Sequence, residues 1–234
     1  ENRGGSTYNE VNVVAKAASD GYTLLLVSNS FWLAPLLQTV SFDPMRDFAA
    51  ISLTNMAVNV LVVTPGLPVK SVQELIALAK AKPGVLNYGS GSTGASNHLA
   101  AELFKYMAGV NIVRIPYKGT APALLDVIAG QVQMMFPSGG GATAHLKSGK
   151  LRALAVTSAQ PSLLYPGLPT VAASGVPGYE LVAMYGILAP AKTPAALVTR
   201  LNQEIVRVLN RADIKEKYLN VGLEVIAGSP AQLA

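Results

Sequence analysis

The stretch from Asn87 to Leu103 constrains the fold most, because it joins a short strand to a helix through a loop of small residues. We predict a short strand over 85–88, and Gly, Ser and Thr make up the loop. The following helix carries apolar residues three and four positions apart, which predicts one buried side; these are Leu99, Leu103, Phe104 and Met107. A strand that passes into a helix through such a loop is typical of α/β folds.

The loop in this stretch has the chemistry of an anion site. Gly89, Gly91 and Gly94 allow the backbone to approach a ligand closely and to take a positive φ. The first-turn N–H groups of the helix have no partner within it and carry the positive end of the macrodipole, so they suit a carboxylate or a phosphate. Hydroxyl groups nearby either cap the helix or bind a ligand oxygen; they belong to Ser92, Thr93 and Ser96. A well-capped turn without a ligand is the alternative interpretation.

Strand-length apolar runs alternate with helical stretches along the chain. Residues 22–27 form a continuous apolar run, as expected for a parallel strand buried on both faces. A helix over 71–81 is predicted by Ser71 as its cap and by Glu74 three positions later. We therefore predict an α/β fold with largely parallel sheets and helices on both faces.

Composition excludes several classes of protein. Half of the 234 residues are hydrophobic, yet no uninterrupted apolar stretch reaches the roughly 18 residues that a membrane-spanning helix needs. The net charge of +5 comes from scattered basic residues, so we expect no nucleic-acid partner, whereas a mildly basic protein favours an anionic small ligand. The absence of cysteine excludes disulfides, thiolate metal sites and cysteine nucleophiles.

Catalytic residues are sparse. Neither His98 nor His145 has another ligand at metal-binding spacing, so we expect no metal. No Gly-x-Ser-x-Gly motif occurs, although a Ser-His-Asp triad stays open because its members need not be adjacent in sequence. A chain poor in acids and bases but rich in hydroxyls and glycines at strand ends favours binding over catalysis.

The motif Gly89-x-Gly91-x-x-Gly94 also matches the dinucleotide-binding fingerprint. The acid that should follow about 20 residues later is missing, and the region reads Val113-Arg114-Ile115. Since an arginine can hold a 2′-phosphate, an NADP-dependent oxidoreductase is an alternative function.

Further motifs occur in order along the chain: Glu1-Asn2-Arg3, Asp20-Gly21-Tyr22-Thr23-Leu24-Leu25, Phe42-Asp43-Pro44 with Asp47-Phe48, Asn59-Val60-Leu61-Val62-Val63, Leu86-Asn87-Tyr88 with Gly91-Ser92, His98-Leu99-Ala100 with Glu102-Leu103-Phe104, Pro116-Tyr117-Lys118-Gly119, Gly149-Lys150-Leu151-Arg152-Ala153-Leu154-Ala155-Val156-Thr157, Pro169-Thr170-Val171 and Tyr185-Gly186. With these motifs the chain resembles, over essentially its whole length, the periplasmic solute-binding receptors of tripartite tricarboxylate transporters, also called Bug-type receptors.

The resemblance implies a two-lobe periplasmic binding protein fold of the type II-like class. It places lobe 1 at residues 1–64 and 189–234 and lobe 2 at residues 65–188. A carboxylate is held between the lobes, largely by main-chain groups and bridging waters. The ligand-binding residues that the resemblance implies are Ser28, Asn59, Gly91, Ser92, Thr93, Gly94, Ser96, Tyr117, Pro137, Ser138 and Tyr185.

Two departures from the family pattern matter. The family's first strand, glycine loop and first helix, and its final helix, have no counterpart here, so we expect a chain trimmed at both ends, and a truncated receptor that binds nothing is an alternative. Where family members often carry an Asp that pairs with a ligand amino group, this chain has Pro137 and Ser138. We therefore expect a plain carboxylate rather than an amino acid.

The sequence thus predicts a periplasmic receptor, not an enzyme, that captures a small carboxylate for uptake. Its partners are the ligand and the membrane permease subunits of the transporter, and a sensor protein as a further partner stays open. We expect no cofactor, no metal and no catalytic residue.

Overall fold

The computed structural model describes residues 9–37, 39–91 and 93–233, and its chain divides into two compact units. Unit 1 holds the described residues of Glu1–Met56, Met184–Tyr218 and Val225–Ala234. Unit 2 holds those of Ala57–Ala183 and Leu219–Glu224. The motif Glu1-Asn2-Arg3 and the predicted site residue Ser92 lie outside the described residues.

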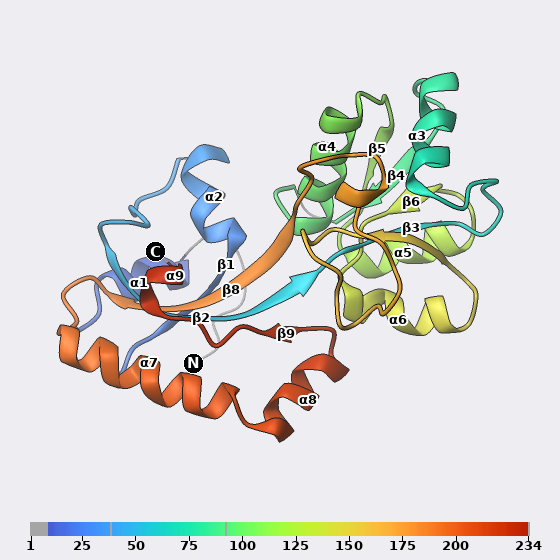
Figure 1. Cartoon of the computed structure of the whole chain (residues 1–234). Helices are drawn as coiled ribbons and strands as arrows, with labels where there is room; N and C mark the ends of the chain where they lie inside the picture. The colour runs from blue at the N-terminus through green and yellow to red at the C-terminus, as the bar shows by residue number, and fades with distance from the viewer. Residues whose placement is uncertain (1–8, 38, 92, 234) are drawn as a thin grey trace. The chain divides into compact units, whose positions relative to one another are not determined.

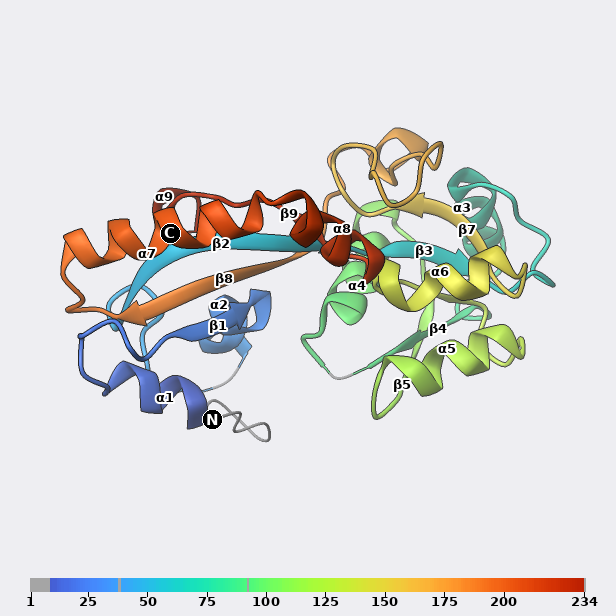
Figure 2. The same cartoon turned by 90° about the horizontal axis from the view of Figure 1, so that it is seen from below.

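Unit 1 is built on a sheet with the strand order β1-β8-β2-β9. The strands are β1 (Leu25–Ser28), β2 (Phe48–Val58), β8 (Val182–Pro190) and β9 (Glu224–Val225). The helices are α1 (Asn9–Ala15), α2 (Asn29–Leu37), α7 (Ala195–Leu209), α8 (Ala212–Asn220) and α9 (Pro230–Leu233). Helix α7 lies on one side of this sheet, and α1 and α2 lie on the other (Figure 2).

Aromatic packing joins α2 to the sheet of unit 1. The rings of Phe31 and Phe42 stack with their centroids 5.3 Å apart, and Phe48 meets Phe31 edge-on at the same distance. All three side chains are buried together with Leu25 and Val27 of β1. Ring pairs in these orientations add to the energy of area burial, so this cluster is the core of unit 1.

The strand predicted over residues 22–27 is β1, but it is not buried on both faces. Leu25 and Val27 are buried, whereas Leu26 between them is exposed. β1 lies at an edge of the described sheet and pairs antiparallel with β8. The continuous apolar run therefore indicated the strand correctly, but the expectation that both of its faces are buried is wrong. Side chains alternate between the two faces of a strand, and here only one face is covered.

Unit 2 is built on a five-stranded sheet with the order β5-β4-β6-β3-β7. The strands are β3 (Val60–Val63), β4 (Asn87–Ser90), β5 (Val113–Pro116), β6 (Met134–Met135) and β7 (Arg152–Val156). β4 runs parallel to β5 and β6, whereas β3 runs antiparallel to β6 and β7. The sheets are thus mixed, and the prediction of largely parallel sheets is wrong. β3 follows β2 after a single residue, so no crossover helix sets its direction.

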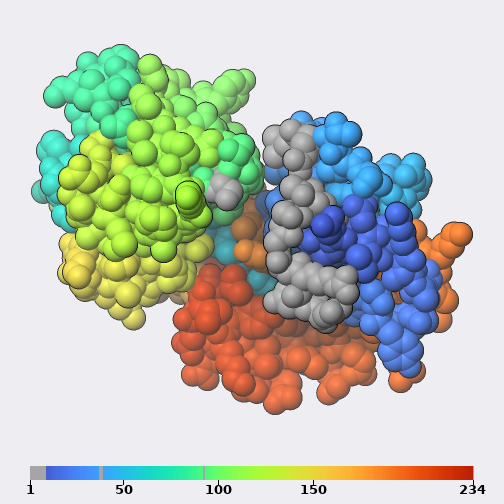
Figure 3. All heavy atoms as spheres, turned by 180° about the vertical axis from the view of Figure 1, so that it is seen from behind, coloured from blue at the N-terminus to red at the C-terminus, as the bar shows by residue number. Residues whose placement is uncertain are grey.

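Helices cover both faces of this sheet, as predicted. Leu61 and Val63 of β3 pack in one core cluster with residues of α3 (Val72–Ala81) and α4 (Ser96–Ala108). Val60 and Val62 pack in a second cluster with residues of α5 (Thr120–Ile128) and α6 (Gly139–Lys147). Figures 1 and 2 show the two helix layers with the sheet between them, and Figure 3 shows α5 and α6 at the surface of unit 2.

The helix predicted over residues 71–81 is α3, and its capping is confirmed. The Glu74 N–H donates to Ser71 Oγ over 3.1 Å, and the Lys70 N–H donates to Glu74 Oε2 over 2.6 Å. Two N–H groups at the start of the helix are satisfied in this way. A short 3₁₀ helix, η1 (Ala172–Ser174), completes the unit. In the described part of the chain, no helix combines the length and apolar character needed to cross a membrane.

Candidate anion-binding site

The loop between β4 and α4 uses its three glycines in different ways. Gly89 lies within β4, where a Cβ atom would sit 3.3 Å from the Cβ of Ala123 on α5, so a glycine permits close packing of strand and helix. Gly94 has a φ of 81°, in the left-handed region. Gly89 and Gly91 have no positive φ, so the expectation that all three glycines take one is wrong for these two.

Helix α4 starts without a side-chain cap. Its N-cap is Ala95, whose carbonyl accepts from the N–H groups of His98 and Leu99 at 3.0 Å each. Neither Thr93 nor Ser96 caps the helix, so the alternative of a turn capped by these hydroxyls is wrong for them. The N–H groups of Ser96 and Asn97 have no partner among the described residues, so this helix start keeps two donors for another group.

Side chains of α4 itself hold the loop over the helix start. The Gly91 N–H donates to Asn97 Oδ1 over 3.3 Å, and Asn97 Nδ2 donates to Thr120 Oγ1 over 3.0 Å. The Gly94 N–H donates to His98 Nδ1 over 3.2 Å. His98 therefore acts as a neutral acceptor at Nδ1.

Arg114 of β5 also contacts this loop. Its Nε donates to Ser90 Oγ over 2.8 Å, its Nη1 to Thr93 Oγ1 over 3.2 Å and its Nη2 to the Gly91 carbonyl over 3.2 Å. Within the described part of the chain Arg114 forms no ion pair with an acidic side chain. Its positive charge thus stays uncompensated beside the positive end of α4. Sequence reasoning considered Arg114 only for a 2′-phosphate, because the pairing of β4 with β5 is not visible in the sequence.

The one carboxylate of α4 is neutralised by its own neighbours. Glu102 accepts hydrogen bonds from the buried Tyr88 hydroxyl and from Lys105 Nζ. Burial raises the pKa of Glu102, but the bonds from Lys105 and Tyr88 bring it below its ordinary value. Burial, and then the charge of Arg114, lowers the pKa of His98, so its imidazole is neutral at pH 7. The start of α4 consequently keeps a positive potential.

Asn59 connects β3 to the start of α4. It is fully buried, its N–H donates to Thr157 Oγ1 over 3.0 Å, and its Nδ2 donates to the Phe136 carbonyl over 2.6 Å. The same Nδ2 lies 3.5 Å from Ser96 Oγ. Asn59 Oδ1 is buried and has no hydrogen-bond partner among the described residues. A buried acceptor of this kind needs a donor, such as a water molecule.

The structure brings several other predicted residues to the same region of unit 2. Ser138 forms an isolated β-bridge with Asn59, and the Pro137 carbonyl accepts from the Val60 N–H over 3.0 Å. The Tyr117 N–H donates to the Ser90 carbonyl over 2.9 Å. Its hydroxyl, however, donates to Asp126 Oδ2 over 2.6 Å, and burial together with Asp126 raises the pKa of Tyr117 to about 12.

Two predicted site residues lie on unit 1. Ser28 of β1 stands opposite Tyr185 of β8 in the strand register. Ser28 Oγ lies 3.0 Å from Ser30 Oγ, and the Tyr185 carbonyl accepts from Thr54 Oγ1 over 2.9 Å. These two residues form a group of their own at the end of β1.

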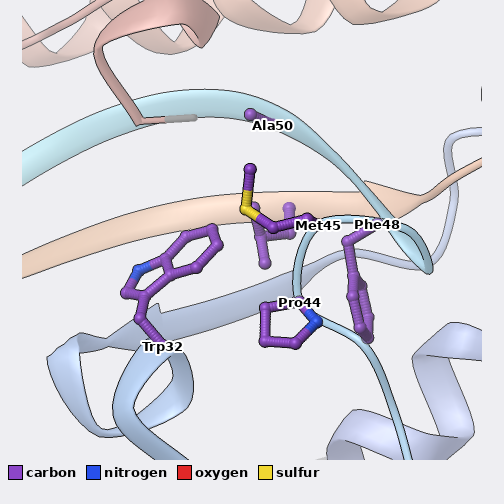
Figure 4. A pocket seen from close by; sticks show the side chains of 6 residues that line it. Trp32, Pro44, Met45, Phe48 and Ala50 are labelled. Atoms are coloured by element: carbon purple, nitrogen blue, oxygen red, sulfur yellow. The ribbon is translucent and has the colours of Figure 1, made fainter. Parts of the chain in front are cut away.

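Unit 1 also contains a small pocket of about 50 Å³ (Figure 4). None of the side chains that line it is charged; they belong to Trp32, Pro44, Met45, Phe48, Ala50 and Leu188. The lining thus offers no charged group to an anion. In residues 9–37, 39–91 and 93–233 there is no group of three or more side chains that could hold a metal ion.

Comparison with known proteins places these features in a family. The family model described as "Tripartite tricarboxylate transporter family receptor" matches residues 1–234. Protein BugT of Bordetella pertussis is 34% identical over 224 residues, which are 94% of this chain and 69% of BugT. The structure of Rpa4515 from R. palustris with adipate is 37% identical with a TM-score of 0.82, covering 95% of this chain and 75% of that one. MatC from Rhodopseudomonas palustris with bound malate is 27% identical with a TM-score of 0.78, and the match covers 96% of this chain and 78% of that one.

The fold is therefore the two-lobe α/β fold of periplasmic binding proteins. The matching proteins are binding proteins rather than enzymes, so the oxidoreductase alternative is not supported. The family model spans the whole sequence, and BugT exceeds 30% identity over 94% of it. The chain belongs to the receptor family of tripartite tricarboxylate transporters, the TctC or Bug family.

Proposed function

We propose that this protein is a periplasmic receptor that captures a small carboxylate for uptake by a tripartite tricarboxylate-type transporter. The observation that carries the proposal is the uncompensated positive charge at the start of α4. There the N–H groups of Ser96 and Asn97 have no partner among the described residues, and the Arg114 guanidinium has no acidic one. Both features favour an anion.

In this proposal main-chain groups provide most of the hydrogen bonds to the ligand. First-turn N–H groups of α4 donate to a carboxylate oxygen, and a water bonded to Asn59 Oδ1 bridges to the ligand. The proposed contacts on unit 2 are Asn59, Gly91, Thr93, Gly94, Ser96, Tyr117, Pro137 and Ser138. We assign Ser28 and Tyr185 of unit 1 and Ser92 to the same ligand as a prediction.

The named ligands of two relatives define the chemistry to test. Rpa4515 was solved with adipate and MatC with malate, and both are dicarboxylates. The segment after β6 carries Pro137 and Ser138 rather than an acid, so it offers no partner to a ligand ammonium group. The proposal therefore favours an organic acid over an amino acid.

The remaining parts of the proposal follow from the family. Relatives are periplasmic binding proteins, which supports the periplasm as the location, and permease subunits are the proposed protein partners. Lobe boundaries after residue 64 and after residue 188 stay a prediction. No cofactor or metal enters the proposed binding step.

Isothermal titration with adipate, malate and glutamate tests the proposal. We expect heat of binding with at least one of the two dicarboxylates, weaker binding as salt is raised, and no comparable heat with glutamate. Absence of binding to a full panel of organic acids at millimolar concentration would contradict it. Repeating the titration with a chain extended at both ends to its relatives' length separates the truncated, non-binding alternative, in which only the longer protein binds.

A further inference from the structure

We infer that Arg114 is a positioning residue, which holds Ser90, Gly91 and Thr93 so that the N–H groups at the start of α4 are presented to the ligand. Its effect on the ligand rests on the proposed function. Its effect on the loop does not, and can be measured separately.

The geometry of the contacts carries this inference. β4 and β5 pair in parallel with Tyr88 opposite Arg114, so the backbone of Arg114 is fixed one strand away from the loop. From there a single guanidinium reaches the fully buried Ser90 at Oγ, the Gly91 carbonyl and Thr93 Oγ1, all at 2.8–3.2 Å. A planar fork with five donors can hold three such acceptors at once, which a lysine ammonium on a flexible stem cannot do.

The acceptors of Arg114 are all neutral. Two are hydroxyls and one is a carbonyl, so the hydrogen bonds order the loop without cancelling the charge. The guanidinium and the positive end of α4 have the same sign, and an anionic ligand offsets their repulsion. Arg114 thus has two separable effects, on the geometry of the loop through its fork and on the potential through its charge.

Arg152 provides a matched control in the same unit. It lies on β7 and its guanidinium also bonds only to neutral groups, donating to the carbonyls of Leu67 at 3.1 Å, Val69 at 2.9 Å and Pro65 at 3.3 Å. The three carbonyls belong to the loop between β3 and α3, which is a different loop from the one that precedes α4. Exchanging either arginine for lysine keeps the charge and removes the fork.

The first experiment measures amide hydrogen exchange in the whole chain, without ligand. We expect Arg114→Lys to speed exchange of the Gly91 and Gly94 amides by about tenfold or more, and Arg152→Lys to do so only for the Leu67 and Val69 amides. A Thr93→Val variant, which keeps Arg114 and removes one acceptor, should give a smaller change in the same direction as Arg114→Lys. Wild-type exchange rates at Gly91 and Gly94 in Arg114→Lys would overturn the inference.

The second experiment titrates the same proteins with adipate and with malate. We expect Arg114→Lys to weaken whichever acid binds by about tenfold although the charge is kept, and Arg152→Lys to leave the affinity unchanged. Unchanged affinity in Arg114→Lys would overturn the role toward the ligand. If the wild-type protein binds neither these two acids nor any other of the organic-acid panel, the proposed function is contradicted, whereas the exchange rates still decide whether Arg114 positions the loop.

Discussion

Helices α4 and α6 of unit 2 begin alike, after a strand and a short loop and without a side-chain cap, but they are held by different means. At α6 the contacts are neutral. The Gly139 carbonyl accepts from the hydroxyls of Tyr165 and Thr143. Gly140 lies so close to Gly222 that a Cβ atom on either would overlap backbone atoms of the segment opposite.

At α4 the contacts include a charged side chain besides the neutral Asn97 and His98. Arg114 holds the preceding loop from one strand away, and His98 accepts the Gly94 N–H from within the helix. The comparison teaches that a free helix start is not enough to define a site in this chain. One start is used for packing between backbone segments, and the other combines its dipole with a charge, as an anion site requires.

The largest expected effect is a loss of stability when a glycine at the start of α6 is replaced, compared with replacement of the glycine next to it. A Cβ at position 140 would overlap the Val221 carbonyl oxygen, so we expect Gly140→Ala to lower the free energy of unfolding by about 3 kcal/mol. In Gly141→Ala the new Cβ would meet only Ser138 Oγ at 3.7 Å, so we expect a gain of about 0.5–1 kcal/mol. Urea unfolding of both variants measures the difference. Equal stabilities would break the view that α6 is fastened by this glycine contact.

A smaller effect is expected for the positive-φ glycines at the two ends of α4. Gly94 and Gly109 have φ values of 81° and 61°, so Gly94→Ala and Gly109→Ala should each cost about 1–2 kcal/mol of stability. Only Gly94→Ala should also weaken adipate or malate binding, because Gly109 lies at the far end of the helix. Unfolding and titration of the same samples check this. Equal loss of affinity in both variants would remove the link between the helix start and the ligand.

Acidity should act on the start of α4 through His98. Burial, and then Arg114, lowers the pKa of His98, so the unfolded chain binds this proton more readily than the folded one. Stability from this group is present above the unfolded pKa of about 6.5 and is lost as pH falls toward 5, by less than about 1 kcal/mol because the ring is partly exposed. His98→Asn keeps an acceptor for Gly94 but cannot titrate. Between pH 7 and pH 5 the free energy of unfolding should fall more for the wild-type protein than for His98→Asn. An equal fall in both proteins would contradict the assignment of His98 as a neutral acceptor.

The smallest expected effect concerns hydroxyls in the first turns. Ser96 Oγ caps nothing and lies 3.5 Å from Asn59 Nδ2, so Ser96→Ala should change stability by less than about 0.5 kcal/mol. Thr143→Val removes a hydroxyl that bonds to the Gly139 carbonyl and should cost about 1 kcal/mol. Thermal unfolding distinguishes them. A larger loss in Ser96→Ala would show that the start of α4 is used for packing as well.

Local patterns could be predicted from the sequence, and long-range pairings could not. The cap of α3 was visible because Ser71 and Glu74 lie three residues apart, and the helices on both faces of unit 2 followed from the alternation of strands with helices in an apolar chain. The direction of β3 was not visible, since it depends on how the chain enters from β2. A period of two or 3.6 residues identifies an element but not its neighbour in the sheet.

The candidate site shows the same division. Gly94 was identified correctly as a positive-φ position, because only glycine takes that conformation without strain. The role of Arg114 was missed, since strand pairing brings it to residues more than 20 positions earlier. The contact of Gly140 with Gly222 spans a still longer separation and leaves no local signal.

That contact has a consequence for the order in which the polypeptide is made. Unit 2 holds an uninterrupted stretch to Ala183 and then only Leu219–Glu224, which the ribosome delivers later. A nascent chain that has reached residue 183 can pair β3 to β7, but Gly140 meets its partner only after some 40 more residues have been added. The contact that fixes the start of α6 is therefore among the last of unit 2 that can form during synthesis.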